Sequence, residues 1–198
     1  MATLAENKTA KRNRILESAY ELFTRKSVTA TPIDDVVKMA GVAKGTFYLY
    51  FKDKYDLLDQ IIAYKSAEIV KKAADFVSIK NNIRSLEEKV LCMADYIVDS
   101  LNENKELTAL LNKNFSRCFR IIHSGNSEET AELMNRIVSP FEKNGYSREE
   151  AGKIIYIIVD MVGSVCCDAI LGMGPFSLEE IRENLRKGIL GILEVHKF

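Results

Sequence analysis

The chain contains no tryptophan, only two histidines, and no Cys-x-x-Cys pair among its four cysteines. His123 and His196 lie far apart in the sequence, so the histidines and cysteines do not show the spacing of a zinc ligand set. We therefore expect no metal and no cofactor. The chain also lacks a nucleophile–base motif and a phosphate-binding loop, so the sequence does not indicate an enzyme.

The cysteines are Cys92, Cys118, Cys166 and Cys167. We interpret them as reduced thiols that pack as small apolar residues in a cytoplasmic protein. The adjacent pair Cys166–Cys167 leaves a redox sensor open as an alternative. Residues 1–9 lack the apolar stretch of a secretory signal peptide, which agrees with a cytoplasmic location.

One long apolar run, residues 154–173, raises the question of a membrane span. Asp160 and Asp168 interrupt this run, and each would cost about 2.5–3.5 kcal/mol near the centre of a bilayer. Gly163 and Ser164 weaken the run further as a membrane helix. We therefore predict a buried helix of a soluble protein and no membrane partner.

A net charge is also absent, because 28 basic residues balance 28 acidic residues. The balance is uneven along the chain, however. Residues 1–54 carry ten basic and six acidic side chains, whereas residues 55–198 carry eighteen and twenty-two. A basic excess favours contact with nucleic-acid phosphates, and here it surrounds the most informative motif of the chain.

That motif is the segment 31–58, TPIDDVVKMAGVAKGTFYLYFKDKYDLL, which predicts two short helices and the start of a long one. Thr31 is the expected N-cap of the first helix, Pro32 occupies its first position, and Gly41 ends it. A three-residue turn leads to a second helix at residues 44–50. Two short helices joined in this way are typical of a helix-turn-helix, whose second helix enters the DNA major groove.

The side chains of the motif suit contacts with DNA. The second helix offers Lys44 to a phosphate or a guanine, Gly45 for close approach, and the hydroxyl and methyl groups of Thr46. Tyrosine and lysine side chains that follow can donate hydrogen bonds to phosphates. The predicted DNA-binding residues are Thr31, Lys44, Gly45, Thr46, Tyr48, Tyr50 and Lys54.

With these residues, the segment 11–58 resembles the N-terminal domain of the TetR family of transcriptional regulators. The matching pieces are KRNRILESAYELF, TPIDDVVKMAGVAKGTFYLYF and KDKYDLL, which together cover about a quarter of the chain. Ala43 stands where the family commonly has a serine N-cap, a loss of about 1 kcal/mol. Leu49 stands where a polar or aromatic residue is common. The resemblance implies a repressor that binds palindromic double-stranded DNA as a homodimer and is released by a small-molecule effector.

The whole chain is predicted to be all-α, with about nine helices, because no long stretch alternates with a period of two. We expect a helix-turn-helix DNA-binding domain at residues 1–54 and an effector-binding and dimerisation domain at residues 55–198. Residues 1–9 are expected to form a flexible arm. A long helix beginning at Asp53 is predicted to link the two domains.

Further helices are predicted from cap signals in the second domain. A serine followed three residues later by glutamate marks a helix start at Ser85, Ser147 and Ser177. One more helix is predicted over residues 105–123, and Pro140 is predicted to kink another.

Large apolar and soft side chains in the second domain can line a ligand cavity, as the resemblance implies. They are Phe76, Met93, Tyr96, Phe115, Cys118, Phe119, His123 and Tyr156, with Asp160 as a charged member. Such a lining would suit an apolar or amphipathic effector. The same residues can instead form ordinary core. Asp160 can pair with a cationic ligand or make a buried bond to an arginine, a tyrosine or the backbone.

The last two long helices carry the expected dimer interface. The helix over residues 147–172 is apolar almost all round and must be covered on both sides. The final helix contains two interior glycines, each costing about 1 kcal/mol relative to alanine, which close approach of another helix would explain. The predicted interface residues are Val162, Val165, Leu185, Gly188, Ile189 and Ile192.

Two alternatives remain open at this point. Both of the last helices can simply complete a monomeric core. The chain can also be a DNA-binding dimer without a small-molecule effector.

Overall fold

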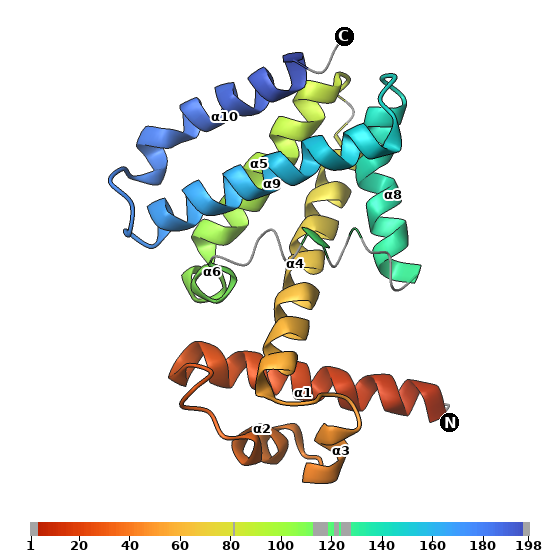
Figure 1. The fold of residues 1–198 in the computed structure, drawn as a ribbon, viewed down its shortest axis with the longest axis vertical. Helices are drawn as coiled ribbons and strands as arrows, with labels where there is room; N and C mark the ends of the chain where they lie inside the picture. Colours follow the sequence, from red (N-terminus) through yellow and green to blue (C-terminus); the bar gives the residue numbers. More distant parts are fainter. Residues whose placement is uncertain (1–3, 81, 113–118, 121–122, 124–127, 196–198) are drawn as a thin grey trace. The chain divides into compact units, whose positions relative to one another are not determined.

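The computed structural model describes residues 4–80, 82–112, 119–120, 123 and 128–195. Within these residues the chain forms nine α-helices and no strand, which confirms the predicted all-α class (Figure 1). No helix of the described part is long and apolar enough to cross a membrane. The chain divides into two compact units, Met1–Tyr64 and Lys65–Phe198. The expected domain boundary after residue 54 remains a prediction.

The helices follow one another with short connections. They are α1 (Leu4–Lys26), α2 (Ile33–Ala40), α3 (Lys44–Tyr48), α4 (Lys54–Ser78), α5 (Leu86–Glu103), α6 (Lys105–Leu111), α8 (Glu128–Glu142), α9 (Arg148–Ile170) and α10 (Leu178–Val195). α4 is continuous across the boundary between the two units.

The first unit is a small helical domain in which α1 packs against α2 and α2 packs against α3. Its core consists of apolar side chains spaced three or four residues apart on each helix, as expected for amphipathic helices. The buried members are Ile15, Leu16, Ala19, Phe23, Val36, Val37, Ala40, Phe47, Phe51, Leu57, Ile61 and Ile62. α1 begins at Leu4, so the expectation of a flexible arm over residues 1–9 is wrong from residue 4 onward.

The predicted helix starts are confirmed where their cap residues accept backbone hydrogen bonds. Asp53 Oδ1 accepts from the N–H groups of Tyr55 and Asp56 at 2.8 and 2.9 Å, at the start of α4. These bonds, with that from Asp56 the stronger, lower the pKa of Asp53. Ser85 and Ser147 form complete capping boxes with the glutamates three residues later.

One predicted helix is shorter than expected. α6 ends at Leu111 because Asn112 leaves the helical region, with φ −49° and ψ 131°. The single helix predicted over residues 105–123 is therefore wrong at this point. The sequence could not show this end, because residues 105–123 contain neither glycine nor proline.

The second unit is built around α9, which packs against α5, α6, α8 and α10. Its inward side chains include Ile154, Ile158, Cys166 and Cys167, all buried. α10 is tied to α5 by ion pairs of Arg182 with Asp99 and of Arg186 with Asp95. α5, α8 and α9 are the helices that, with the second half of α4, surround the cavity described below.

The turn between α2 and α3 requires a glycine, and this requirement can be measured. Gly41 lies in the left-handed region at φ 63°, whereas Gly45 has ordinary helical backbone and no other atom within 4 Å of the place that a Cβ would take. Gly41→Ala should therefore lower the free energy of unfolding by about 1 kcal/mol. Gly45→Ala should raise it by about 0.5–1 kcal/mol, because alanine is the better helix former. Thermal unfolding followed by circular dichroism measures both, and an equal change in the two variants would contradict the assigned turn.

Candidate functional site

The helix-turn-helix expected from the sequence is present in the first unit. α2 ends at Gly41, and the Val42 N–H donates to the Val37 carbonyl at 3.0 Å, closing the turn. α3 begins after Ala43, which provides no side-chain cap, as the sequence predicted. The helix is held instead by Phe47, which is fully buried beneath it.

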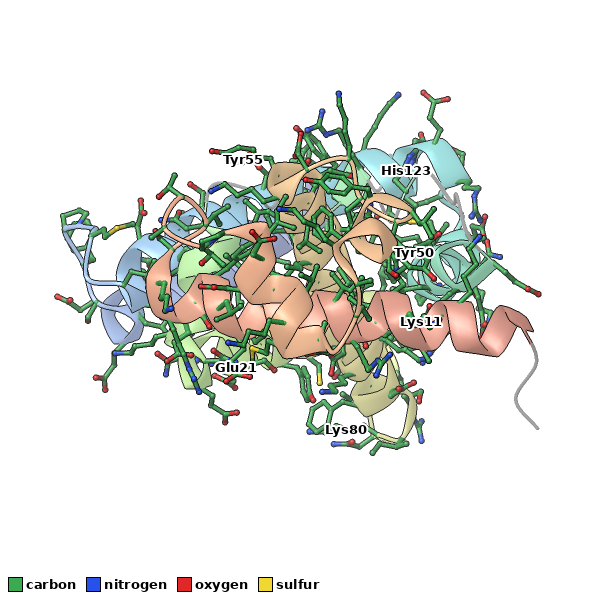
Figure 2. All side chains as sticks on the ribbon, turned by 90° about the horizontal axis from the view of Figure 1, so that it is seen from below. Lys11, Glu21, Tyr50, Tyr55, Lys80 and His123 are labelled. Atoms are coloured by element: carbon green, nitrogen blue, oxygen red, sulfur yellow. The ribbon has the colours of Figure 1, made fainter. Side chains whose placement is uncertain are left out.

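The opposite face of α3 is open to solvent. Lys44, Gly45 and Tyr48 are exposed, and Thr46 and Tyr50 are half-buried. Figure 2 shows the side chains of this unit from below, with Tyr50 and the α1 residue Lys11 labelled. The structure thus brings five of the predicted DNA-binding residues onto or beside one short helix. The sixth, Lys54, lies at the start of α4 and donates to the Thr29 carbonyl at 2.9 Å.

Thr31 differs from expectation. It is only 1% exposed, and its hydroxyl donates to the Ser27 carbonyl at 2.7 Å. The N-cap of α2 is Pro32, which has no side chain that can cap, so the expected capping role of Thr31 is wrong. Its burial also removes its side chain from the surface that a phosphate could reach. Thr31 instead fixes the loop that precedes α2.

The sequence interpretation missed the partner of Lys44. The ammonium of Lys44 lies 2.7 Å from Asp34 Oδ1 on α2, and both side chains are largely exposed. The hydrogen bond to Asp34, together with its charge, raises the pKa of Lys44. Asp34 stands in the first turn of α2, and no local pattern in the sequence shows that a carboxylate of α2 meets the first residue of α3.

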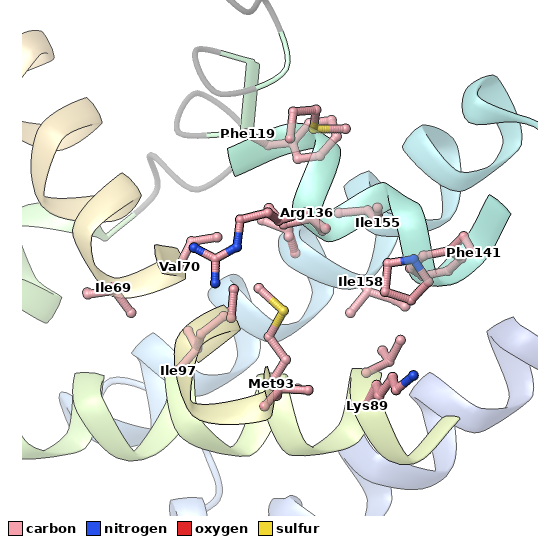
Figure 3. A pocket seen from close by; sticks show the side chains of 18 of the residues that line it. Ile69, Val70, Lys89, Met93, Ile97, Phe119, Arg136, Phe141, Ile155 and Ile158 are labelled. Carbon is pink, nitrogen blue, oxygen red and sulfur yellow. The ribbon is translucent and has the colours of Figure 1, made fainter. Parts of the chain in front are cut away.

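The second unit contains a cavity of about 860 Å³. Its wall is mainly apolar and comes from α4, α5, α8 and α9, as the close-up in Figure 3 shows. Representative lining side chains are Val70, Met93, Ile97, Phe141, Ile155 and Ile158. Small-molecule sites in proteins have volumes of roughly 300–1,000 Å³ and similarly apolar walls, so the cavity is large enough for a ligand.

Only part of the predicted pocket set lines this cavity. Met93 and Phe119 belong to the wall. Phe76 and Tyr96 contact each other with tilted rings, 5.0 Å apart between centroids, and line a separate, more polar depression with Asp95 and Asp99. Phe115 and Cys118 lie outside the described residues.

The remaining three candidates lie on the surface of the single chain. Tyr156 is 41% exposed and contacts the Phe119 ring at 5.6 Å, and His123 is exposed with its ring 5.4 Å from the same side chain. Asp160 is exposed on α9, so neither a buried bond nor a place in the cavity wall is present for it. The expectation failed because α9 is apolar on almost every face, and helical spacing could not show which face is outward.

The sequence does contain a pattern that indicates the observed cavity wall, namely aliphatic and small residues at helical spacing. In α4 the lining positions are Ser66, Ile69, Val70, Ala74, Val77 and Ser78, a helical spacing that places them on one face. α5 repeats this spacing. The residues expected to line the pocket were large apolar and soft side chains, and that expectation did not include these stripes of aliphatic and small residues.

The expected dimer residues fall into two groups. Val162, Leu185 and Ile189 are buried within their own chain, Ile189 to 1% exposure, which corrects their assignment as surface contacts. They complete the core between α9 and α10, as amphipathic helices require. The Met161 sulfur lies 3.5 Å from the position of a Cβ on Gly188, so this glycine serves close packing within the chain.

The outward face of α9 nevertheless carries apolar side chains. Ile157 and Val165 are 45% and 40% exposed, and the half-buried Met161 lies between them at a spacing of four residues. Gly191 of α10 is exposed and has no atom within 4 Å of its Cβ position, and Ile192 is half-buried. Val165 on α9 and Ile192 on α10 remain candidates for an interface between copies.

In the part of the chain that the structure describes, the titratable groups form neither a metal site nor a reactive thiol pair. Among the described residues, no group of three histidine, cysteine, aspartate or glutamate side chains is arranged to hold a metal ion. Cys166 and Cys167 are fully buried, and burial raises the pKa of the Cys166 thiol to about 11. A thiol that remains protonated is a poor nucleophile, which argues against the redox-sensor alternative.

Comparison with known proteins supports the assignment of a helix-turn-helix to the first unit. Residues 15–61 match the family described as bacterial regulatory proteins, tetR family. A similar curated protein is the uncharacterized HTH-type transcriptional regulator YhgD of Bacillus subtilis (strain 168), 44% identical over 59 residues. That match covers 30% of this chain and 31% of the relative, so the chain spans less than a third of the relative's length.

Similarity to solved structures extends over nearly the whole chain. The fatty acid degradation regulator FadR from Bacillus halodurans has a TM-score of 0.61 and 19% identity, covering 91% of this chain and 94% of its own. The regulator FadR from Bacillus subtilis in complex with stearoyl-CoA has a TM-score of 0.56 and 17% identity, covering 89% and 96%. At these identities the likeness shows the fold alone.

The burial of the cysteines predicts their reactivity. At a pH of about 8, iodoacetamide should alkylate Cys92 of the folded protein, because this residue is only half-buried and lines the depression beside Phe76. Cys166 and Cys167 should remain unmodified until the protein is unfolded, and peptide mass spectrometry identifies each site. Rapid alkylation of Cys166 in the folded protein would contradict the assigned burial.

Proposed function

The chain is a member of the TetR family of bacterial regulatory proteins, and we propose that it is a cytoplasmic repressor that binds a palindromic DNA operator as a homodimer. In this proposal, an apolar or amphipathic effector fills the cavity of the second unit and releases the operator. The observation that carries the proposal is that one chain combines an exposed helix-turn-helix with an apolar cavity of about 860 Å³. The curated relative, named as a transcriptional regulator, supports the DNA-binding half.

DNA contact is assigned to the open face of α3. Lys44 and Tyr48 are exposed there, and Phe47 anchors the helix from beneath. Ten basic and six acidic residues in the segment 1–54, which contains the helix-turn-helix, give this segment a positive excess that favours DNA phosphates. Two copies related by a twofold axis would double the excess and match two half-sites of a palindrome.

The effector is assigned to the cavity because the volume and the apolar wall of the cavity fit a small molecule. This fit favours a ligand-controlled regulator over a regulator without a ligand. Small residues at the wall, such as Ser66, Ala74 and Ala94, leave this space open. The FadR structure from Bacillus subtilis contains stearoyl-CoA, which supports the idea that a chain of this fold can hold an acyl ligand.

We assign the coupling between the two sites to α4. This helix contains Leu57 and Ile61 in the core of the first unit and Val70 and Ala74 in the cavity wall of the second. An effector that binds the protein more tightly in one placement of α4 than in another increases the population of the favoured placement. The size of this shift follows from the difference between the two affinities. Two recognition helices at a changed separation no longer fit half-sites about 34–36 Å apart.

The proposal is tested by a band-shift experiment on the DNA that flanks the gene of this protein, with and without a panel of apolar compounds. We expect a retarded band that at least one compound abolishes. Ala74→Phe should fill part of the cavity, so this variant should still bind DNA but respond less to the compound. Ala67→Phe is the control, because Ala67 is a half-buried residue of α4 outside the cavity wall. A retarded band that no compound changes would favour the DNA-binding dimer without an effector.

The Asp34–Lys44 pair predicts two opposite effects on DNA affinity. Lys44→Ala should weaken operator binding and reduce the slope of log affinity against log salt by about one unit, because one phosphate contact is lost. Asp34→Asn should strengthen binding, because it removes a negative charge and leaves Lys44 available to a phosphate. Salt titrations by fluorescence anisotropy measure both, with Lys153→Ala on α9 as the control for a lysine in an exposed ion pair. Unchanged affinity in both variants would contradict the assigned DNA face.

The outward face of α9 predicts how the dimer can be broken without unfolding the chain. Ile157→Glu should give a folded monomer with weak operator binding, because it places a charge in an apolar contact between copies. Ile189→Asp should instead unfold the second unit, since Ile189 is buried in its own chain. Sedimentation velocity and circular dichroism separate the two outcomes. A dimeric Ile157→Glu variant would exclude this face as the interface.

A further inference from the structure

One charged side chain reaches into the apolar cavity of the second unit. Arg136 on α8 belongs to the same cavity wall as Val70, Met93 and Ile97, and all four side chains are labelled in Figure 3. The side chain is 32% exposed, and it donates to Asp75 Oδ1 on α4 at 2.5 Å. A guanidinium is always charged, so beside an apolar wall an acceptor with a negative charge stabilises it.

The other charged side chains at the cavity are mostly positive. Lys80, Lys89 and Lys143 contribute to its wall, against the single carboxylate of Glu132. The Lys80 ammonium lies 4.2 Å from the centre of the Phe76 ring. These three lysines outnumber the one carboxylate at the wall, so their charges make the potential at the cavity positive. Such a potential attracts an anion and disfavours a cation.

The bond between Arg136 and Asp75 is one that a ligand can replace. Asp75 is 56% exposed, so its carboxylate can turn to water when it loses the arginine. Arg136 needs a new acceptor, and the planar guanidinium matches a carboxylate or a phosphate in two parallel hydrogen bonds. An apolar chain attached to that group would lie along the aliphatic wall formed by Val70, Ile97 and Ile158.

We propose that the effector is an amphipathic anion whose acidic head replaces Asp75 as the partner of Arg136. This inference rests on the proposed function of the cavity as the effector site, and it assigns the ligand class and the contact that changes on binding. The exchange breaks a charge-assisted bond between α8 and α4, the helix that continues into the helix-turn-helix unit. A further ion pair between these helices, Lys71–Glu129, is 3.8 Å long and well exposed, so it restrains α4 only weakly.

The test compares an acid with the alcohol of the same chain length. Dodecanoate and palmitate, dodecanol and hexadecanol, and dodecyl phosphate are titrated into the full chain by calorimetry, below their micelle concentrations. The carboxylates or the phosphate should bind about tenfold more tightly than the alcohols, as one charge-assisted pair allows. Comparing the carboxylates with dodecyl phosphate distinguishes which acidic head the site prefers.

Two substitutions then test whether the Arg136–Asp75 bond accounts for the tighter binding of the acid. Arg136→Gln should weaken binding of the acid about tenfold and leave binding of the alcohol unchanged, because only the acid uses the guanidinium. Asp75→Asn should tighten binding of the acid several-fold, since the competing carboxylate is lost. Arg182→Gln is the control, because the Arg182–Asp99 pair joins α10 to α5 outside the cavity wall and is about as exposed as the Arg136–Asp75 pair.

Each outcome separates this inference from the proposed function. Equal binding of acid and alcohol, or acid binding that neither substitution changes, would overturn the assigned anion and leave an apolar effector site intact. If Arg136→Gln does not fold, the failure of Asp75→Asn to tighten acid binding overturns the inference by itself. If neither acids nor alcohols bind, the ligand class proposed here is wrong, and the band-shift with other apolar compounds still tests the effector role of the cavity.

Discussion

The continuity of α4 is the constraint on which both sites depend. The helix runs from Lys54 to Ser78 without a glycine or a proline, so its backbone hydrogen bonds are unbroken across the boundary of the two units. Asp53 caps its first turn in the first unit, and Asp75 holds Arg136 near its end in the second. In our proposal, a ligand that changes the partner of Asp75 acts on the same helix that begins beside the helix-turn-helix.

The cavity of the second unit lowers the stability of the fold. Apolar side chains around an open space lack packing partners, which lowers the stability of the fold. The chain keeps this space by placing Ser66, Ala74 and Ala94 where larger side chains would fill it. Binding of a ligand would restore the missing contacts and stabilise the unit, and this gain can be directed to one placement of α4 if the ligand fits that placement better.

The sequence predicted the local features well and the surfaces less well. Caps at Asp53, Ser85 and Ser147 and the turn at Gly41 follow from the chemistry of a few neighbouring residues, and each is confirmed. The cavity wall could not be predicted in detail, because it depends on which faces of four helices meet. α9 shows this limit most clearly: its apolar residues surround the helix, so spacing alone could not separate the buried Val162 from the exposed Ile157.

The central claim is that binding of the effector weakens binding of the operator to the same protein. The reciprocal effect of the operator on effector affinity tests this claim most directly. The dissociation constant of the effector should be measured by calorimetry for the protein alone and for the protein saturated with operator DNA. If an effector lowers operator affinity by a given factor, thermodynamic linkage requires operator to lower effector affinity by the same factor. We predict equal factors of at least about tenfold. An effector that binds the free and the operator-bound protein equally well would contradict the account.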